Sequence, residues 1–516
     1  MKVAIKPKHG AWIAAVITTV IVMILQRDVG IARDETVYMA AGDRYAEWWT
    51  GLVKFKHGFD GKLIEQTFGG AFGGGGNPEH PPLIKLASGL SHRWFGSYRL
   101  PGAVSHGVLA YLIFVMVLEL WGLAEAILAC VCLLTLPRAL FHAGLDCFDA
   151  PTMTLWFASI YAYWRCLDGR KWPWQAGVVW GLALATKHTA LLLPFAIAVH
   201  YAVIAWRARD WKVHWRVPVA MAVIGPLVLL ILWPWLWLDP IGHIKGWLQF
   251  HSNHVHYNFE YLGVNWNHPR FPWHVAIITT LFTVPTATLA AAAIGAGVWI
   301  GKAREKIDRA PVLLLVLSAC AAIAPFFLGT TPIFGAEKHW MPILPTICIA
   351  AGVGGVWAAR QVPRISQRTS VIAVIAMVAL AGVNEVIVSH PYALTWYSAA
   401  AGGAPGGADK GMNRQFWGVA AKGIVPELAT LAPGRVYSHD ASPAWHYYID
   451  DGELPKGFAD AGQEGAGIAN SMYAIVIHEK HFNRHDYMIW KNYVTTQPIF
   501  VLRSDGVPIV SLYKRP

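Results

Sequence analysis

Charged residues are scarce in this sequence, and cysteines are few. Asp, Glu, Lys and Arg together make up 14% of the 516 residues, whereas soluble domains carry about 25%. So few charges cannot cover the surface of a water-soluble protein of this length, and we expect most of that surface to face lipid. Six cysteines are present and none follows residue 348, so the C-terminal segment has no disulfide of its own.

Several sequence signatures of enzyme and binding classes are missing as well. The glycine-rich stretch 69–76 lacks the Gly-Lys-Ser/Thr ending of a phosphate-binding loop. The chain has no zinc-finger spacing, nucleophile elbow or nucleotide-binding fingerprint. The net charge of +11 does not indicate nucleic acid, because the Lys and Arg residues form short clusters between apolar runs. Such clusters are typical of cytoplasmic membrane loops, so membrane lipid is the expected partner.

Long apolar runs are abundant, and eleven of them are candidate membrane spans. They cover residues 10–26, 100–119, 122–138, 150–167, 174–187, 189–206, 217–238, 274–300, 311–329, 340–359 and 370–389. The first run ends without a small-residue cleavage site, so we interpret it as an uncleaved helix and not as a signal peptide. The expected fold class is an α-helical polytopic membrane protein.

The basic clusters fix the expected orientation of these spans. With a cytoplasmic N-terminus, the inside loops contain Lys2, Lys6 and Lys8; Arg165, Arg170 and Lys171; Arg207, Arg209, Lys212 and Arg216; Lys302, Arg304, Lys306 and Arg309; and Arg360, Arg364 and Arg368. Segments 27–99, 139–149, 239–273 and 390–516 then lie outside. We expect a transmembrane domain over residues 1–389 and an extracytoplasmic domain over the remainder.

The extracytoplasmic segment 390–516 has an ordinary soluble composition. Its apolar stretches 472–477, 498–502 and 507–513 predict short strands, the last two joined by the turn Ser504-Asp505-Gly506. We expect a small α/β or α+β domain.

The first candidate for chemistry is the pair Asp34-Glu35, at the start of a helix predicted to lie on the membrane over residues 33–50. In this helix Tyr38 and Tyr45 share the apolar face, whereas Glu35 is expected on the opposite, polar face. Acidic residues are favoured at a helix N-terminus by its exposed N–H groups and its dipole, which explains one carboxylate. The alternative is a general base that takes a proton from an acceptor hydroxyl. The sequence pattern supports both.

The second candidate is the stretch from Asn77 to Lys85, which reads Asn-Pro-Glu-His-Pro-Pro-Leu-Ile-Lys. Its two consecutive prolines fix an extended backbone, so Glu79 and His80 are held with little freedom. A rigid loop that starts a helix over 83–95 is the simpler interpretation, but such a loop does not require Glu79 and His80.

Ionisable residues also stand at the outer ends of predicted spans, namely Asp146, Asp149, Lys187, His188, Lys338 and His339. A charge at membrane depth is costly and usually marks a site or pathway. Snorkelling to the headgroups is the alternative, and it is a serious one for Lys338. Lys187 stands in an apolar stretch between two closely linked spans, which favours a functional role.

The outer loop 239–273 is rich in histidine. His251, His254 and His256 are candidate metal ligands, but three histidines in one short segment are weak evidence for a metal site. Histidines among aromatic residues also suit the membrane interface, which is the interpretation we favour.

Acids, bases and cations at one membrane face suit transfer from a phosphate-linked lipid. Phosphate is a good leaving group, so cationic stabilisation matters more than a general acid. One carboxylate is then enough to deprotonate the incoming hydroxyl, whereas a glycoside hydrolase usually needs two carboxyl groups flanking the bond.

Five motifs follow one another in a specific order: Asp34-Glu35, Pro-Glu-His-Pro-Pro-Leu at 78–83, Asp149-Ala-Pro, Gly-Leu-Ala-Leu-Ala-Thr-Lys at 181–187 and Lys-His-Trp-Met-Pro-Ile-Leu-Pro at 338–345. This order resembles the GT-C membrane glycosyltransferases, and most of all the bacterial protein O-mannosyltransferase and aminoarabinose-transferase-like families. The stretch from His390 to Gly418 also looks like the segment that follows the last span in bacterial members. The resemblance covers about residues 10–420.

The resemblance implies a polyprenyl-phosphate-linked sugar as donor and inversion at the anomeric carbon. It implies that Asp34 is the catalytic carboxylate, with Glu35 as the neighbouring candidate. The expected substrate-binding residues are Glu79, His80, Lys85, Asp149, Lys187, His188, Lys338 and His339. His80 stands where the aminoarabinose-transferase-like pattern has Lys, so phosphate contact there is lost or pH-dependent. A divalent metal at Glu79 with His254 or His256 is the one cofactor that the resemblance raises.

We therefore expect a glycosyltransferase of the bacterial cytoplasmic (inner) membrane that acts on an extracytoplasmic acceptor. A protein hydroxyl, lipid A and an envelope glycan all remain open as acceptor. A lipid-linked oligosaccharide ligase or polymerase is one alternative. A lipid or solute transporter is another, although the two related halves common in transporters are not visible here.

Overall fold

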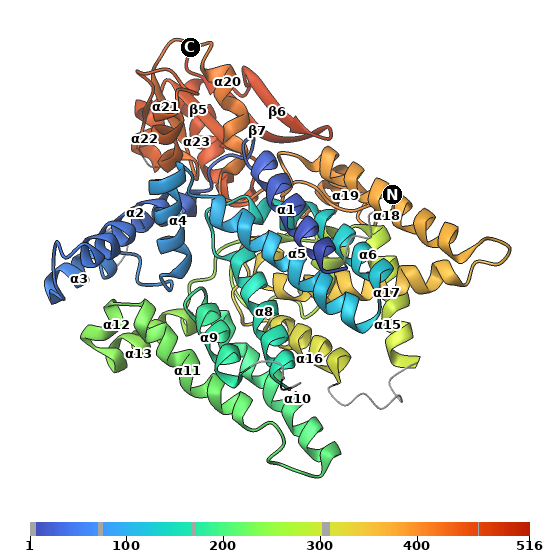
Figure 1. The fold of residues 1–516 in the computed structure, drawn as a ribbon. Coiled ribbons are helices and arrows are strands. Elements are labelled where there is room, and N and C mark those ends of the chain that lie inside the picture. The colour runs from blue at the N-terminus through green and yellow to red at the C-terminus, as the bar shows by residue number, and fades with distance from the viewer. Residues whose placement is uncertain (1–6, 71–75, 168, 170–171, 302–309, 463) are drawn as a thin grey trace, which may run out of the picture.

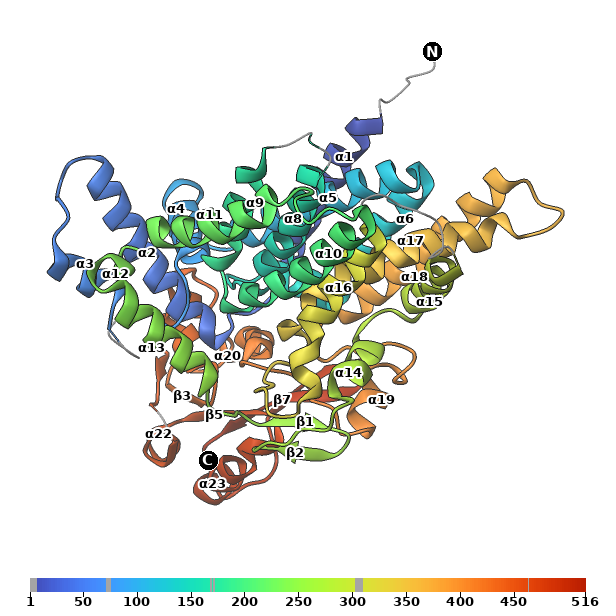
Figure 2. The same cartoon turned by 90° about the horizontal axis from the view of Figure 1, so that it is seen from below.

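The computed structural model describes residues 7–70, 76–167, 169, 172–301, 310–462 and 464–516. Most of the glycine-rich stretch 69–76 lies outside these residues, as do the basic residues Lys2, Lys6, Arg170, Lys171, Lys302, Arg304, Lys306 and Arg309. A bundle of helices forms the body of the protein (Figure 1). Figure 2 shows the C-terminal sheet and its helices below this bundle.

Each expected span coincides with a helix or with consecutive helices. They are α1 (Pro7–Leu25), α5 (Leu100–Leu120), α6 (Leu123–Leu134), α7 (Pro137–Ala143), α8 (Asp149–Leu167), α9 (Pro173–Leu184), η1 (His188–Leu192), α10 (Leu193–Ala208), α11 (Arg216–Leu232), α12 (Trp235–Leu238), α14 (Val275–Thr283), α15 (Thr286–Gly301), α16 (Pro311–Ile323), η2 (Ala324–Phe327), η4 (Met341–Ile343), α17 (Leu344–Arg360) and α18 (Gln367–Ser389). By length and composition, the described residues contain four helices able to cross a membrane, or up to six if each of two bent pairs is one span. The number of eleven spans stays a prediction.

Two of the expected spans are not straight. Helices α6 and α7 are bent by 71°, and α14 and α15 by 119°. Pro137 is the first residue of α7, and Pro285 immediately precedes α15. The residue before each proline, Leu136 in one case and Val284 in the other, has an extended backbone. The proline ring disfavours helical geometry in the preceding residue, so each helix stops there and the chain turns. Each bent pair is either one broken span or a re-entrant loop, so the spans expected over 122–138 and 274–300 stay predictions.

The outer segments form a second layer on the bundle. It contains α2 (Arg33–Val53), α3 (Gly61–Phe68), α4 (Leu83–Phe95), α13 (Pro240–Ser252), β1 (Phe259–Tyr261), β2 (Val264–Trp266), η3 (Ala336–His339) and α19 (Gly403–Asp409). Helices α2 and α4 pack closely where Gly42 and Gly89 meet. A Cβ at position 89 would lie 1.9 Å from the Gly42 carbonyl oxygen, so this close packing requires a glycine there. On α2, Tyr38 and Tyr45 are buried as predicted. The prediction that Glu35 lies on a polar face is wrong, since its exposed fraction is 1%.

The C-terminal part is a small mixed sheet with short helices, which confirms the predicted class. Its elements are η5 (Val419–Ile424), α20 (Val425–Leu428), β3 (Arg435–Ser438), η6 (Ser442–Ala444), α21 (Trp445–Asp450), β4 (Ala459–Asp460), α22 (Glu464–Asn470), β5 (Tyr473–Ile477), η7 (Lys480–Phe482), α23 (Asn483–Tyr493), β6 (Phe500–Ser504) and β7 (Val507–Lys514). The strand order is β4-β3-β5-β7-β6. Strand β3 runs parallel to β4 and β5, whereas β7 pairs antiparallel with β5 and β6. The predicted hairpin is therefore β6–β7.

Two hydrophobic cores meet close to the start of η5. Residues Leu394, Tyr397 and Trp417 belong to the core of the helical bundle. From Ala420 onward, buried apolar residues belong mainly to the core under the sheet. The stretch between α18 and η5 is thus packed into the bundle, and the sheet domain rests on it.

The segments predicted to lie outside the membrane gather on one side of the bundle. The backbone N–H of Ile31 donates a hydrogen bond to the Tyr448 hydroxyl at 2.8 Å. His251 Nε2 lies 2.9 Å from the Glu79 carbonyl oxygen, and Lys480 Nζ donates to the Gly263 carbonyl oxygen at 3.1 Å. These contacts join the first outer loop, the outer loop 239–273 and the sheet domain. That shared side is what the predicted topology requires.

Reporter fusions check which side this is. We expect fusions at Lys212 and at Pro363 to report the cytoplasm, because both sites lie in basic loops. A fusion at the C-terminus is expected to report the opposite side. Alkaline phosphatase activity and green fluorescent protein fluorescence give complementary readouts at each site. A C-terminal fusion on the same side as Lys212 would mean that a span has been miscounted.

Candidate active site

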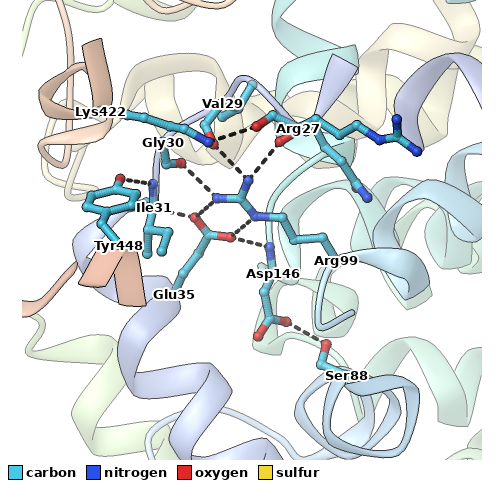
Figure 3. Close-up of polar contacts among 12 residues, drawn as sticks. Arg27, Val29, Gly30, Ile31, Glu35, Ser88, Arg99, Asp146, Lys422 and Tyr448 are labelled. Carbon is cyan, nitrogen blue, oxygen red and sulfur yellow. Dashed lines mark hydrogen bonds and ion pairs between the residues drawn. The ribbon is translucent and has the colours of Figure 1, made fainter. Parts of the chain in front are cut away.

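The segment before α2 is organised around Glu35, the third residue of that helix. Its carboxylate accepts hydrogen bonds from the backbone N–H of Ala32 at 2.8 Å, which caps the helix, and from that of Asp146 at 2.6 Å. The Arg99 guanidinium donates two further bonds to it, both 2.8 Å long. Figure 3 shows Arg99 enclosed by Glu35 and by carbonyl oxygens of the turn before α2. Glu35 therefore has a structural place, and its oxygens are not free for a substrate.

A Glu35→Gln variant is expected to be less stable. The substitution leaves the buried Arg99 guanidinium without its counter-charge, which typically costs roughly 3–5 kcal/mol. Thermal unfolding of the purified protein measures the loss. Glu47→Gln, an exposed substitution on the same helix, is the matched control and is expected to unfold like the wild type. Equal midpoints for the Glu35 and Glu47 variants would contradict this assignment.

Asp34 differs from its neighbour in both burial and contacts. Its side chain is 35% exposed, and among the described residues its ion pair is with Arg33 Nε at 3.5 Å. The helix is capped through Glu35 and not through Asp34. Glu35 is thus the acidic residue that caps the helix. The Asp34 carboxylate is not used for capping and is open to solvent and to a substrate.

The loop before α4 is held from below by Lys85. This side chain is 1% exposed, and its ammonium group donates to the carbonyl oxygens of Asn77 and His80 and to Asn77 Oδ1, at 2.7–2.9 Å. Burial lowers the pKa of Lys85 to about 7, against the effect of the Glu79 and Asp146 carboxylates. A neutral amine has two hydrogens, so three acceptors favour the ammonium form. With all its hydrogens used, Lys85 shapes the loop, whereas we had expected it to bind substrate.

Glu79 and His80, in the loop that Lys85 holds, have different surroundings. Glu79 accepts a hydrogen bond from Asn77 Nδ2 at 3.0 Å. The His80 ring packs against Phe148 with 4.4 Å between ring centroids and edge-on against Tyr38 at 6.0 Å. Burial, and next the Lys85 charge, hold the pKa of His80 well below its usual value. The ring is therefore neutral at pH 7 and offers no charge to a phosphate there.

Three histidines from three outer segments meet beside this cluster. His188, at the start of η1, stacks on His251 of α13 with 3.6 Å between ring centroids, and His80 lies 5.7 Å from His251. Burial lowers the pKa of His251 to about 4. The stack joins the loop 77–82, η1 and α13 around the same space.

A buried ion pair joins Asp149 and Lys187. Their side chains meet at 2.5 Å and are almost fully buried. Helix α9 ends at Leu184, and Lys187 has an extended backbone before η1 begins. This break directs the ammonium group over the Phe148 ring, 5.3 Å from its centroid. Asp149 is the first residue of α8, so two helix ends supply the pair.

Lys338 lies near this pair and interacts electrostatically with Asp149. Its exposed fraction is 9%, and its ammonium group lies 4.2 Å from the Trp417 ring centroid and 4.9 Å from that of Phe334. Its direct contacts in the described part of the chain are with these aromatic rings, and no carboxylate there lies at ion-pair distance from it. Its neighbour His339 contacts the Phe334 carbonyl oxygen through Nε2 at 2.7 Å. A buried cation held by aromatic faces, and not by a carboxylate, has its charge available for an anion.

A second buried ion pair, not expected from the sequence, joins Arg138 to Glu337, the residue before Lys338. Arg138 donates to Glu337 at 2.9 Å and to the carbonyl oxygens of Leu394 and Trp396. His142 Nε2 lies 3.9 Å from Glu337. The sequence does contain a signal for this pair. Arg138 stands at the end of an apolar run, and a charged residue at that depth seldom lacks a partner.

Glu79, His254 and His256 do not form a metal-ligating group in the described part of the chain. Within the described ranges no group of three or more His, Cys, Asp or Glu side chains has the arrangement of a metal site. His254 stacks on Phe334 at 5.0 Å, and His256 lies beside Phe271 at 5.9 Å. The histidine that contacts Glu79 is His251, through the Glu79 backbone oxygen. This arrangement gives no support to a metal held by Glu79 with His254 or His256.

Comparison with known proteins gives one family match and several similar solved structures. Residues 79–237 match the family described as dolichyl-phosphate-mannose-protein mannosyltransferase. ArnT from Cupriavidus metallidurans bound to undecaprenyl phosphate has 15% sequence identity, and the two structures align over 97% of each chain with a TM-score of 0.51. The archaeal oligosaccharyltransferase AglB from Archaeoglobus fulgidus, in complex with an inhibitory peptide and a dolichol-phosphate, has 10% identity and a TM-score of 0.51 over 93% of this chain and 70% of that one. No curated protein matches the sequence.

These similarities confirm the GT-C glycosyltransferase fold that the sequence motifs resemble. The chain has this fold, which is a multi-pass, membrane-embedded one with a small extra domain. The family match points to a glycosyltransferase, and the two solved structures show the fold. The matched range contains Glu79, Asp149 and Lys187, and it ends before the outer loop that carries His251.

Proposed function

We propose that this protein transfers a sugar from a polyprenyl-phosphate-linked donor to a hydroxyl group outside the cytoplasm, with inversion at the anomeric carbon. ArnT bound to undecaprenyl phosphate and AglB with a dolichol-phosphate have the same fold, which supports a lipid-linked donor. The membrane in question is the bacterial cytoplasmic membrane, with the sheet domain on its outer side.

The placement of one open carboxylate close to two buried cations carries the proposal. Asp34 and Tyr38 are on the first turns of α2, and the Tyr38 ring packs against Phe148 at 5.0 Å. The same Phe148 ring lies under the Lys187 ammonium group. The Tyr38 and Phe148 rings thus link the base for the acceptor to a cation for the donor phosphate. We place the donor sugar alongside these two rings, with its phosphate toward Lys187.

In the proposed step, the acceptor oxygen attacks the anomeric carbon while Asp34 accepts the hydroxyl proton. The bond between that carbon and the phosphate oxygen breaks, and the electron pair leaves with the lipid phosphate. Lys187 and Lys338 offset the charge that develops on the leaving phosphate, which is the largest electrostatic demand of the reaction. A single displacement of this kind inverts the anomeric centre. Asp149 holds Lys187 in place through their buried ion pair.

Transfer of a preassembled oligosaccharide is the second candidate. The similarity to AglB, an oligosaccharyltransferase, has the same TM-score as that to ArnT, so the fold does not separate a single sugar from a larger glycan.

Mass spectrometry of envelope lipids, glycans and proteins from a deletion strain identifies both the transferred group and the acceptor. We expect one modification to disappear, to return with the wild-type gene and to stay absent with Asp34→Asn. Return with Glu47→Gln serves as the control. An unchanged set of glycans in the deletion strain would contradict the proposed function.

A further inference from the structure

The sheet domain holds the chain immediately before Asp34 at several points. The Tyr448 hydroxyl accepts a hydrogen bond from Ile31 N–H at 2.8 Å, and Lys422 donates to the Arg27 carbonyl oxygen at 2.8 Å (Figure 3). Gly30 packs so closely against the sheet domain that a Cβ there would lie 2.1 Å from the Val419 carbonyl oxygen. The backbone that leads into α2 is therefore held by residues far away in the sequence. Tyr448 is 417 positions from its partner Ile31, and Lys422 is 395 positions from Arg27.

One side chain links this contact to Asp34. The Arg33 backbone N–H donates to the Trp417 carbonyl oxygen at 3.1 Å. Its guanidinium donates to Asp440 Oδ1 at 3.0 Å and lies 3.5 Å from Asp34 Oδ1. Arg33 thus stands between two carboxylates, one on α2 and one on the sheet domain. Asp440 is the more buried of the two, with 13% of its side chain exposed against 35% for Asp34.

The topology of the sheet places Asp440 at this contact. Strands β3 and β5 are parallel neighbours, so their carboxyl ends lie at the same edge of the sheet. Asp440 follows β3, and Glu479 follows β5. Glu479 is a further acidic group at this edge, and the Lys480 N–H beside it donates to Glu260 Oε1 at 2.6 Å. The edge that faces α2 therefore carries several acidic side chains, and Arg33 pairs with one of them, Asp440.

The other groups around Arg33 do not compete strongly for its charge. Burial, and next the Asp440 and Glu260 charges, raise the pKa of Glu479 well above its usual value. A raised pKa favours the uncharged form of Glu479 and so weakens its attraction for Arg33. Burial also raises the pKa of Tyr38, which lies on the same helix as Asp34, and lowers the pKa of His481 to about 4. Among the described residues, Asp440 and Asp34 are the carboxylates that pair with the Arg33 guanidinium, and Tyr257 also interacts with it.

We propose that the sheet domain completes the active site, because Asp440 holds Arg33 and so sets how strongly the guanidinium stabilises the Asp34 carboxylate. Arg33 and Asp440 are positioning residues, and this inference rests on the proposed role of Asp34 as the base. A guanidinium that paired with Asp34 alone would favour the ionised carboxylate more strongly and make it a weaker base. Asp440 takes part of the guanidinium charge away from Asp34, because Arg33 pairs with both carboxylates.

The test uses two variants that are expected to move the same measurement in opposite directions. Asp440→Asn gives the whole Arg33 charge to Asp34, so the acid limb of the pH–rate profile should move to lower pH by about half a unit to one unit. The transfer rate on the plateau should fall about twofold to threefold, because the base is weaker. Arg33→Met removes the charge and should move the acid limb to higher pH. In the double variant, Asp440→Asn should shift the acid limb less than it does alone, because only the direct repulsion between the Asp440 and Asp34 carboxylates is then removed.

Controls and a second readout keep this result separate from the proposed function. Asp451→Asn, an exposed substitution in the same domain, should leave the profile unchanged. Infrared difference spectra between each protein and its own Asp34→Asn derivative follow the protonation of Asp34 directly, whether or not sugar is transferred. Opposite shifts in these spectra without any transfer would retain the coupling and reject the proposed function. Shifts of Asp440→Asn and Arg33→Met in the same direction, or no shift in a protein that transfers sugar, would overturn the coupling.

Discussion

Asp34→Asn is expected to lower the rate of sugar transfer by roughly 10²–10⁴-fold, the usual cost of losing a general acid or base. The protein should stay folded, because the helix is capped through Glu35 and because Asp34 is one-third exposed. Asn keeps nearly the same shape but cannot take the proton of the acceptor hydroxyl. Binding of the lipid donor should survive, since the cations assigned to its phosphate are Lys187 and Lys338.

The measurement is transfer rate and donor binding on the purified variant. Glu47→Gln on the same helix is the control, because its side chain is exposed and distant from the proposed chemistry. Glu35→Gln is unsuitable as a control, since the loss of its pairing with Arg99 unsettles the segment before α2. Near-normal transfer by Asp34→Asn would reject Asp34 as the base and leave the fold assignment intact.

Much of the fold follows from local patterns in the sequence. Apolar runs gave the positions of the helices, because a span must satisfy its own backbone hydrogen bonds within lipid. Alternating apolar residues and the turn at Asp505-Gly506 gave the β6–β7 hairpin. The bends before α7 and α15 were missed, although a proline marks both. A window of hydropathy does not distinguish a proline that ends one helix from a proline within a span.

The site was predictable in its residues but less so in their roles. Asp34 and Glu35 are equivalent in the sequence, and the partner that separates them, Arg99, lies 64 positions from Glu35. Lys85 looked like a cation for substrate, yet its three hydrogen bonds fold back on the loop 77–82. The role proposed for Arg33 depends on its hydrogen bond with Asp440, which is 407 positions away in the sequence. Such pairings depend on how the outer segments pack together, which no local pattern records.

The second large effect expected is the loss of sugar transfer when Lys187 is replaced. Because Lys187 pairs with Asp149, replacing both residues separates this loss of activity from a loss of stability. Lys187→Met alone leaves the Asp149 carboxylate buried without a partner, which typically costs roughly 3–5 kcal/mol. A loss of activity in that variant would therefore have two explanations. Replacing both charges, in Lys187→Met/Asp149→Asn, removes the unpaired charge and should restore most of the stability.

Transfer by the double variant then reports on Lys187 itself. If this lysine stabilises the leaving phosphate, the double variant should unfold near the wild-type temperature and still transfer sugar roughly 10²–10³-fold more slowly, as when one preorganised donor is removed from an active site. Lys187→Arg should retain part of the activity, because it keeps the charge but changes its geometry. Thermal unfolding and transfer rates are measured on four proteins: the wild type, Lys187→Met, Asp149→Asn and the double variant. Recovery of both stability and transfer in the double variant would mean that the ion pair only supports the packing of α8 against α9, and that Lys338 is the remaining cation for the donor phosphate.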